Sequence, residues 1–151
     1  MSDRATRRIK FAAATERSRM NHEAACLNYL KLARIAHDKG QWLPRNRLML
    51  LAAITAARAG WLDVAERSRG LLIGWNPRHV INSEASVAQS LNEERVRTLI
   101  QNHEKQISYE RAEHLLSLTG DAPKDQVPEA PDIDAAAHGA CLDLLDHLTP
   151  Q

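Results

Sequence analysis

The chain has 151 residues, enough for one domain with a hydrophobic core of ordinary size. Hydrophobic residues make up 44% of it and aromatic residues only 4%, so Leu, Ile, Val and Ala must supply most of the core. Leu and Ala favour helices, whereas the β-branched and aromatic residues that favour strands are scarce. The composition therefore predicts an all-α fold. The net charge of +1 selects neither a nucleic acid nor a membrane surface as a partner.

The charges are unevenly distributed along the chain. Residues 1–20 carry six basic and two acidic side chains, and residues 120–151 carry seven acidic side chains and one basic. These ends either face each other or are solvated separately. No run approaches the roughly 18 apolar residues that a membrane span needs, and the N-terminus lacks the apolar segment of a secretory signal. We expect a cytoplasmic protein with no membrane association. Its two cysteines, Cys26 and Cys141, do not resemble a disulfide framework.

The N-terminal part of the chain predicts a basic helical arm followed by a second helix. Residues 1–20 form the predicted arm, with a helix over 3–19. The second helix spans 22–38, with Asn21 as its N-cap, and ends at Gly40.

The next predicted helix runs from the first turn at Pro44 to Ala59 and is apolar on all sides. A helix of that kind in a globular protein has to be covered by its neighbours, so we expect it at the centre of the domain. Gly60 follows as its C-terminal cap, in a position that favours positive φ. Another helix spans 62–75 and stops before Pro77.

The remaining elements of the predicted domain, which covers residues 21–120, are marked by capping signals. Residues 78–85 are expected to be a loop, and Ser86 opens a short helix through a capping box. Asn92 is the expected cap of a helix that reaches about residue 105. Ser108 caps the last helix, which Gly120 terminates.

Beyond the domain, the sequence predicts a linker and one further helix. Residues 121–132 contain three prolines and four acidic side chains, a composition typical of a linker. Residues 133–151 follow as a short amphipathic segment, helical over 133–148. Such a helix can dock on its own domain or on another protein.

Residues 46–79 resemble one tetratricopeptide repeat, a 34-residue pair of antiparallel helices. Counted from Asn46, the small residues Ala53, Gly60 and Ala65 and the closing Pro77 occupy the places that the repeat requires. Arg69 departs from the pattern, because the repeat usually packs an aromatic side chain there.

Residues 93–123 resemble a second, looser copy, in which Tyr109 and Ala112 match the repeat. The copies start 47 residues apart, so 80–92 would be an insertion, and together they cover less than half of the chain. The resemblance implies antiparallel helical hairpins in a tetratricopeptide-like arrangement. A generic helical bundle has the same small residues at its helix crossings and stays open as the alternative. The stretch from Asn76 to Leu116 also resembles bacterial proteins, which implies no activity.

The chain lacks the familiar sequence signatures of catalysis. There is no phosphate-binding loop, dinucleotide-binding glycine pattern or nucleophile elbow. Two pairs share a helical face, His22 with Cys26 and Glu110 with His114, but neither pair recruits the further ligands that a zinc site needs. We therefore expect no catalytic residues, no metal and no cofactor. An enzyme with an unrecognised site is a lesser alternative.

The leading functional hypothesis is a protein–protein interaction module or scaffold that offers a groove to a protein or peptide. If the repeat resemblance holds, the first helix of each copy lines the concave face, which makes the candidate partner-binding residues Arg47, Leu50, Ile54, Arg58, Arg97, Gln101 and Lys105. The alternative for Leu50 and Ile54 is burial by helix 22–38. The runner-up function is a nucleic-acid-associated regulator whose N-terminal arginines contact phosphates.

Overall fold

The computed structural model describes residues 21–119 and 133–150, and within these ranges the regular structure is helical and contains no strand. A helix over residues 21–38 comes first. It is followed by α2 (Trp42–Ala59), α3 (Leu62–Trp75), the 3-10 helix η1 (Val80–Ser83), α4 (Val87–Ser90), α5 (Glu94–Gln106), α6 (Tyr109–Leu118) and α7 (Ile133–Leu148). The all-α prediction is confirmed. The predicted basic arm (1–20) and linker (121–132) lie outside the described residues.

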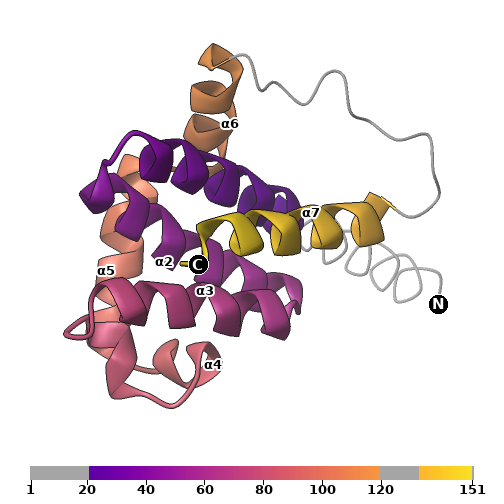
Figure 1. Cartoon of the computed structure of the whole chain (residues 1–151). Helices are drawn as coiled ribbons and strands as arrows, with labels where there is room; N and C mark the ends of the chain where they lie inside the picture. Colours follow the sequence, from indigo (N-terminus) through magenta and orange to yellow (C-terminus); the bar gives the residue numbers. More distant parts are fainter. Residues whose placement is uncertain (1–20, 120–132, 151) are drawn as a thin grey trace, which may run out of the picture.

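Helix α2 lies at the centre of the molecule, as its sequence predicts (Figure 1). All side chains from Leu48 to Ala56 are buried, and α3 packs along α2. Thr55 fits into this apolar helix because its hydroxyl donates to the Leu51 carbonyl at 2.8 Å. Although α2 is strongly apolar, none of the helices in the described ranges has the length and hydrophobicity needed to cross a bilayer.

The turn between α2 and α3 is closed by a left-handed glycine. Gly60 has φ of 85°, and the next backbone N–H, on Trp61, donates to the Ala56 carbonyl at 2.8 Å. This geometry confirms the predicted helix end at Gly60. With only two residues between the helices, α3 folds directly back onto α2.

Replacing this glycine tests the turn. Gly60→Ala is expected to lower the free energy of unfolding by about 1–2 kcal/mol, because an L-residue is strained at positive φ. A new Cβ there would meet no atom within 4 Å, so the loss measures the backbone alone. Gly70, inside α3, has equally open surroundings but no positive φ, and Gly70→Ala should raise stability by about 0.5–1 kcal/mol. Urea denaturation of both variants measures the two effects, and changes of the same sign would contradict this account.

The predicted helix caps are partly confirmed. The Ser108 hydroxyl accepts from the Arg111 N–H at 3.2 Å and starts α6. The Asn92 prediction is wrong by one residue, because Glu93 occupies the N-cap position of α5 without capping it through its side chain. Its carboxylate instead pairs with Arg95 at 2.9 Å. Asn21 is itself helical and is therefore not the cap of the 21–38 helix.

The segment between α3 and α5 is held by polar side chains of α3. A Glu66 carboxylate oxygen accepts from the Val87 N–H at 2.8 Å, at the first turn of α4, and Arg69 donates to the Glu84 carbonyl. Ser86 caps α4 by accepting from the Gln89 N–H, as predicted. The expected loop 78–85 contains the 3-10 turn η1, which the sequence did not indicate.

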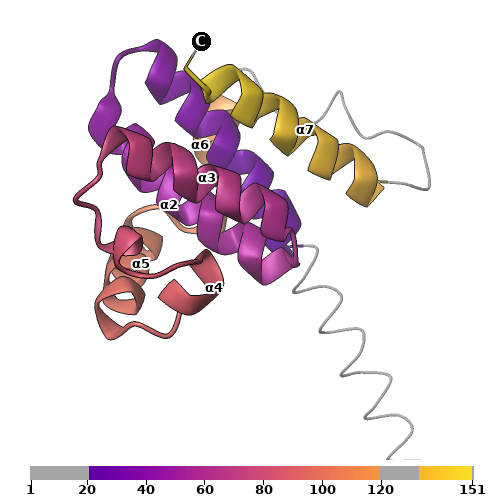
Figure 2. The same ribbon diagram turned by 60° about the horizontal axis from the view of Figure 1, so that its bottom comes forward.

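Helix α7 lies alongside the 21–38 helix and α3, whereas α4 and α5 lie at the opposite end of the bundle (Figure 2). Its bounds, Ile133–Leu148, agree with the prediction. The structure therefore places the C-terminal helix on its own domain.

Candidate functional site

Three apolar side chains of α7 are fully covered by the domain, and Leu142 and Leu144 are partly buried. Cys141, Leu145 and Leu148 are each at most 1% exposed. We call the surface of the 21–38 helix and α3 beneath them the α7 groove. Burial of the two leucines gives α7 a docking contribution of about 1.5–3 kcal/mol per side chain at most.

Polar pairs join both edges of α7 to the domain. Asp38, at the end of the 21–38 helix, lies 3.1 Å from the His147 ring nitrogen. On the α3 side, Arg67 pairs with Asp146 and Asp63 pairs with His138. These pairs are exposed and individually weak, but they fix the position of α7 along the groove.

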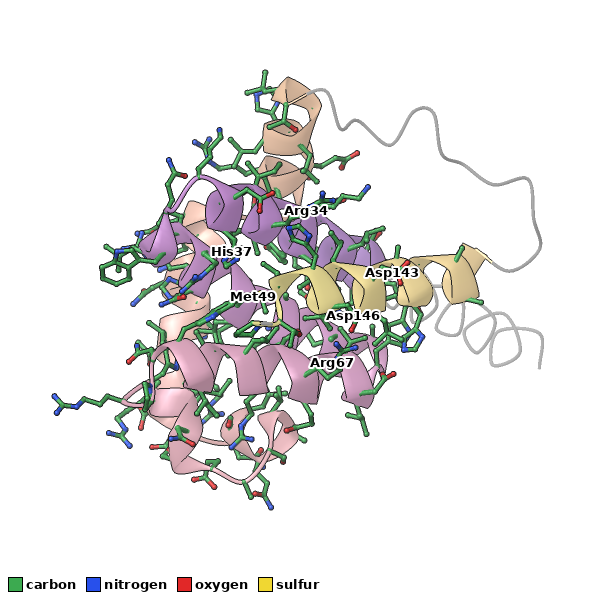
Figure 3. The ribbon with its side chains drawn as sticks, viewed as in Figure 1. Arg34, His37, Met49, Arg67, Asp143 and Asp146 are labelled. Carbon is green, nitrogen blue, oxygen red and sulfur yellow. The ribbon has the colours of Figure 1, made fainter. Side chains whose placement is uncertain are left out.

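The charges around α7 are complementary (Figure 3). Asp143 and Asp146 lie on α7, with Arg34 of the 21–38 helix on one side and Arg67 of α3 on the other. Each edge of the groove carries one basic and one acidic side chain, because Arg34 lies 3.8 Å from Asp38 on the 21–38 helix and Arg67 shares α3 with Asp63. This arrangement suits a helix that carries leucines on one side and both carboxylates and imidazoles beside them.

The N-terminal half of α7 makes a more specific contact. The His138 ring packs edge-on against Trp61, with 5.3 Å between ring centroids, and its Nε2 lies 2.8 Å from an Asp63 oxygen. This hydrogen bond lowers the pKa of the Asp63 carboxyl, so Asp63 is ionised over the whole neutral range. The contact holds the N-terminal half of α7 against the start of α3.

The structure divides the residues predicted to bind a partner into a buried group and an exposed group. Leu50 and Ile54 are fully buried in the core, as in the alternative that helix packing covers them. Neither side chain is accessible to a partner in this conformation. The exposed members of the predicted set, in addition to Arg58, are Arg47, Arg97, Gln101 and Lys105. These side chains are polar, so the α2–α5 face is a charged surface, and the apolar groove lies under α7 instead.

Arg58 belongs to a polar network that the sequence did not reveal. Its guanidinium pairs with Glu104 and donates to the Tyr109 hydroxyl at 3.2 Å, and that hydroxyl lies 2.8 Å from Nδ1 of His22. Burial, followed by the charge of Arg58, lowers the pKa of His22 and so favours its neutral ring. The network joins the 21–38 helix, α2, α5 and α6.

Its members are up to 87 residues apart in the chain, and no local pattern connects them. A buried tyrosine adds a second link beside it, because the Tyr29 hydroxyl donates to the Ile107 carbonyl at 2.7 Å. The network and this bond together anchor the start of α6 to the 21–38 helix.

Three partly buried histidines predict a pH-dependent stability. Burial lowers the pKa of His22, His79 and His103, and Arg58 and Arg47 act in the same direction on His22 and His103, respectively. The folded protein therefore binds these protons less readily than the unfolded chain does. The stability is fully present above the ordinary histidine pKa of about 6.5 and is lost as the pH falls below it.

Urea denaturation at about pH 7.5 and about pH 5.5 measures this loss, and His79→Gln should reduce the difference between the two. A protein that becomes more stable on acidification over this interval would contradict the assignment.

A second exposed surface lies at the beginning of α2. Trp42 and Leu43 are 60% and 54% exposed. Next to them, the Arg45 guanidinium lies 3.7 Å above the Trp75 ring, which stacks on His37. These contacts fasten the first turn of α2 to the last turn of α3, while no described element covers Trp42 or Leu43.

The α7 groove, unlike the exposed surface at Trp42 and Leu43, is occupied by a segment of this chain. We therefore take the α7 groove as the candidate functional site. Comparison of the chain with family models, with curated proteins and with solved structures gave no match.

Proposed function

We propose that this chain is a protein-interaction module whose α7 groove binds an amphipathic helix with acidic side chains beside a leucine ridge. The observation that carries the proposal is the seating of α7 itself, with Leu145 and Leu148 buried and Asp146 paired to Arg67. Binding of an apolar helix face in a groove is a common mode of peptide recognition. In the same proposal, the α2–α3 pair is a tetratricopeptide-like unit that supplies one wall of the groove.

Helix α7 then acts as a built-in competitor for the groove. A partner binds only to molecules in which α7 has left, so its apparent affinity falls by the fraction of open molecules. Weakening α7 raises that fraction and strengthens binding in trans. The nucleic-acid alternative rests on residues 1–20, outside the described residues, and stays a prediction.

A labelled peptide of residues 133–150 tests the groove. Leu145→Ala in the full-length protein removes buried side-chain volume and weakens docking of its own α7 by about 2–5 kcal/mol. Fluorescence anisotropy should show the peptide binding this variant at least about tenfold more tightly than the wild type, since about 1.4 kcal/mol corresponds to tenfold.

Two controls separate groove binding from other effects. Leu118 is 70% exposed on α6, so Leu118→Ala repeats the same substitution outside the groove and should leave the affinity unchanged. A peptide with Asp146→Lys should bind more weakly, because it places a cation beside Arg67. A folded Leu145→Ala protein that does not bind the wild-type peptide would rule the proposal out.

A further inference from the structure

The two cysteines of the chain lie in the same buried core, on two helices that pack side by side. Cys26 lies on the 21–38 helix and Cys141 on α7, 115 residues apart in sequence, and both are completely buried. The Cys26 thiol donates a weak hydrogen bond to the Ala52 carbonyl at 3.5 Å. Both are free thiols, and because the chain has no other cysteine, only one intramolecular pairing exists.

The docked arrangement keeps this pair unreactive. Interaction with the Cys26 thiol, together with burial, raises the pKa of Cys141, while the Lys31 charge offsets a small part of the rise and Asp63 adds to it. Cys141 is therefore a protonated thiol at neutral pH, and the thiolate is the form that reacts. Since neither sulfur is exposed, an oxidant reaches the pair only after α7 moves away from the groove.

We propose that Cys26 and Cys141 form an intramolecular disulfide when α7 opens in the presence of a hydroperoxide, and that this bond then holds α7 in the groove. One thiolate attacks hydrogen peroxide and becomes a sulfenic acid, releasing the first water after proton transfer. The other thiol attacks that sulfur, the S–S bond forms and the second water leaves. In total, two thiols lose two electrons and two protons to one peroxide.

The packing of the two helices favours this bond over other products. His147 pairs with Asp38 and so joins the same two helices that carry the cysteines. When α7 returns to the groove, an oxidised sulfur on one helix meets the thiol on the other. The chemistry of the pair stands independently, whereas its consequence, a locked groove, rests on the proposed function.

Oxidation of the full-length reduced protein tests the pair. After treatment with hydrogen peroxide and denaturation, intact-mass analysis should show a loss of two hydrogen atoms and no reaction with a maleimide. The product should migrate faster on a non-reducing gel, return to the starting form with dithiothreitol, and melt about 10 °C higher. Cys26→Ala and Cys141→Ala should each abolish this product. Oxidation that yields only sulfinic acid or intermolecular dimers would overturn the inference.

The role of α7 opening is tested by the oxidation rate. Leu148→Ala weakens docking and should accelerate disulfide formation about tenfold or more. The exposed-site control Leu118→Ala should react at the wild-type rate. Equal rates for Leu148→Ala and wild type would show that opening does not control the reaction and would refute this part of the inference.

Peptide binding distinguishes the effect of the disulfide on α7 from the ability of the groove to bind a helix. The oxidised protein should not bind the 133–150 peptide, and reduction should restore binding. If the disulfide forms but the peptide binds neither form, the proposed function fails and the cysteine chemistry stands. If the peptide binds but no disulfide forms, the cysteine inference alone fails.

Discussion

Ala53→Asp is expected to abolish the cooperative fold or to leave it barely stable. Ala53 is fully buried near the centre of α2. A carboxyl group placed there is either buried in its charged form or protonated at a cost, and both cost several kcal/mol. Since small domains are stable by only about 5–15 kcal/mol, this single change removes much of the total. Urea denaturation followed by far-UV circular dichroism measures the loss.

The same substitution on the surface serves as the control. Ala24 is exposed on the 21–38 helix, so Ala24→Asp should cost less than about 1 kcal/mol, the difference in helix propensity. Leu51→Asp, at the middle of α2 and equally buried, should behave like Ala53→Asp. If both α2 variants melt cooperatively near the wild-type midpoint, α2 is not the centre of the core.

Leu145→Asp is expected to release α7 and leave the rest of the domain folded. Leu145 is as completely buried as Ala53, but it belongs to a helix that docks at the edge of the bundle. The carboxylate escapes burial when α7 leaves, so the cost is limited to the docking free energy, a few kcal/mol at most. Hydrogen exchange should show amides of 133–148 losing protection while those of α2 and α3 keep theirs.

The control for this experiment is Leu118→Asp, which places the same charge at an exposed leucine and should change no protection in α7. Global unfolding of Leu145→Asp would show instead that α7 is an integral part of the core, and the idea of a releasable competitor would fail.

Features decided by a few neighbouring residues could be predicted from the sequence. Gly60, Ser86 and Ser108 act through bonds to backbone groups within a few residues, and the structure confirms all three. The prediction of a cap at Asn92 was wrong. The neighbouring Glu93 accepts a hydrogen bond from Ser83, ten residues away, and a local sequence pattern does not reveal such a contact. The apolar surface of α2 indicated a central helix, which is also confirmed.

Features that depend on distant segments could not be predicted. Which side of α2 stays open is decided by the helices packed around it, so Leu50 and Ile54 were expected at a surface although both are buried. The burial of Cys26 and Cys141 in one core depends on where α7 docks, and the amphipathic pattern of 133–148 shows only that one side is apolar. Burial depends on tertiary neighbours, and a single sequence does not identify them.

The contact between Trp61 and His138 gives the protein an optical signal of its own. The indole lies on the domain and the imidazole on α7, so their proximity depends on the position of that helix alone. Departure of α7 takes the imidazole away from the indole and leaves that ring more exposed to water, which changes its emission. With Trp42 and Trp75 replaced by phenylalanine, the emission intensity of Trp61 would report the docked fraction directly, in real time and without a label.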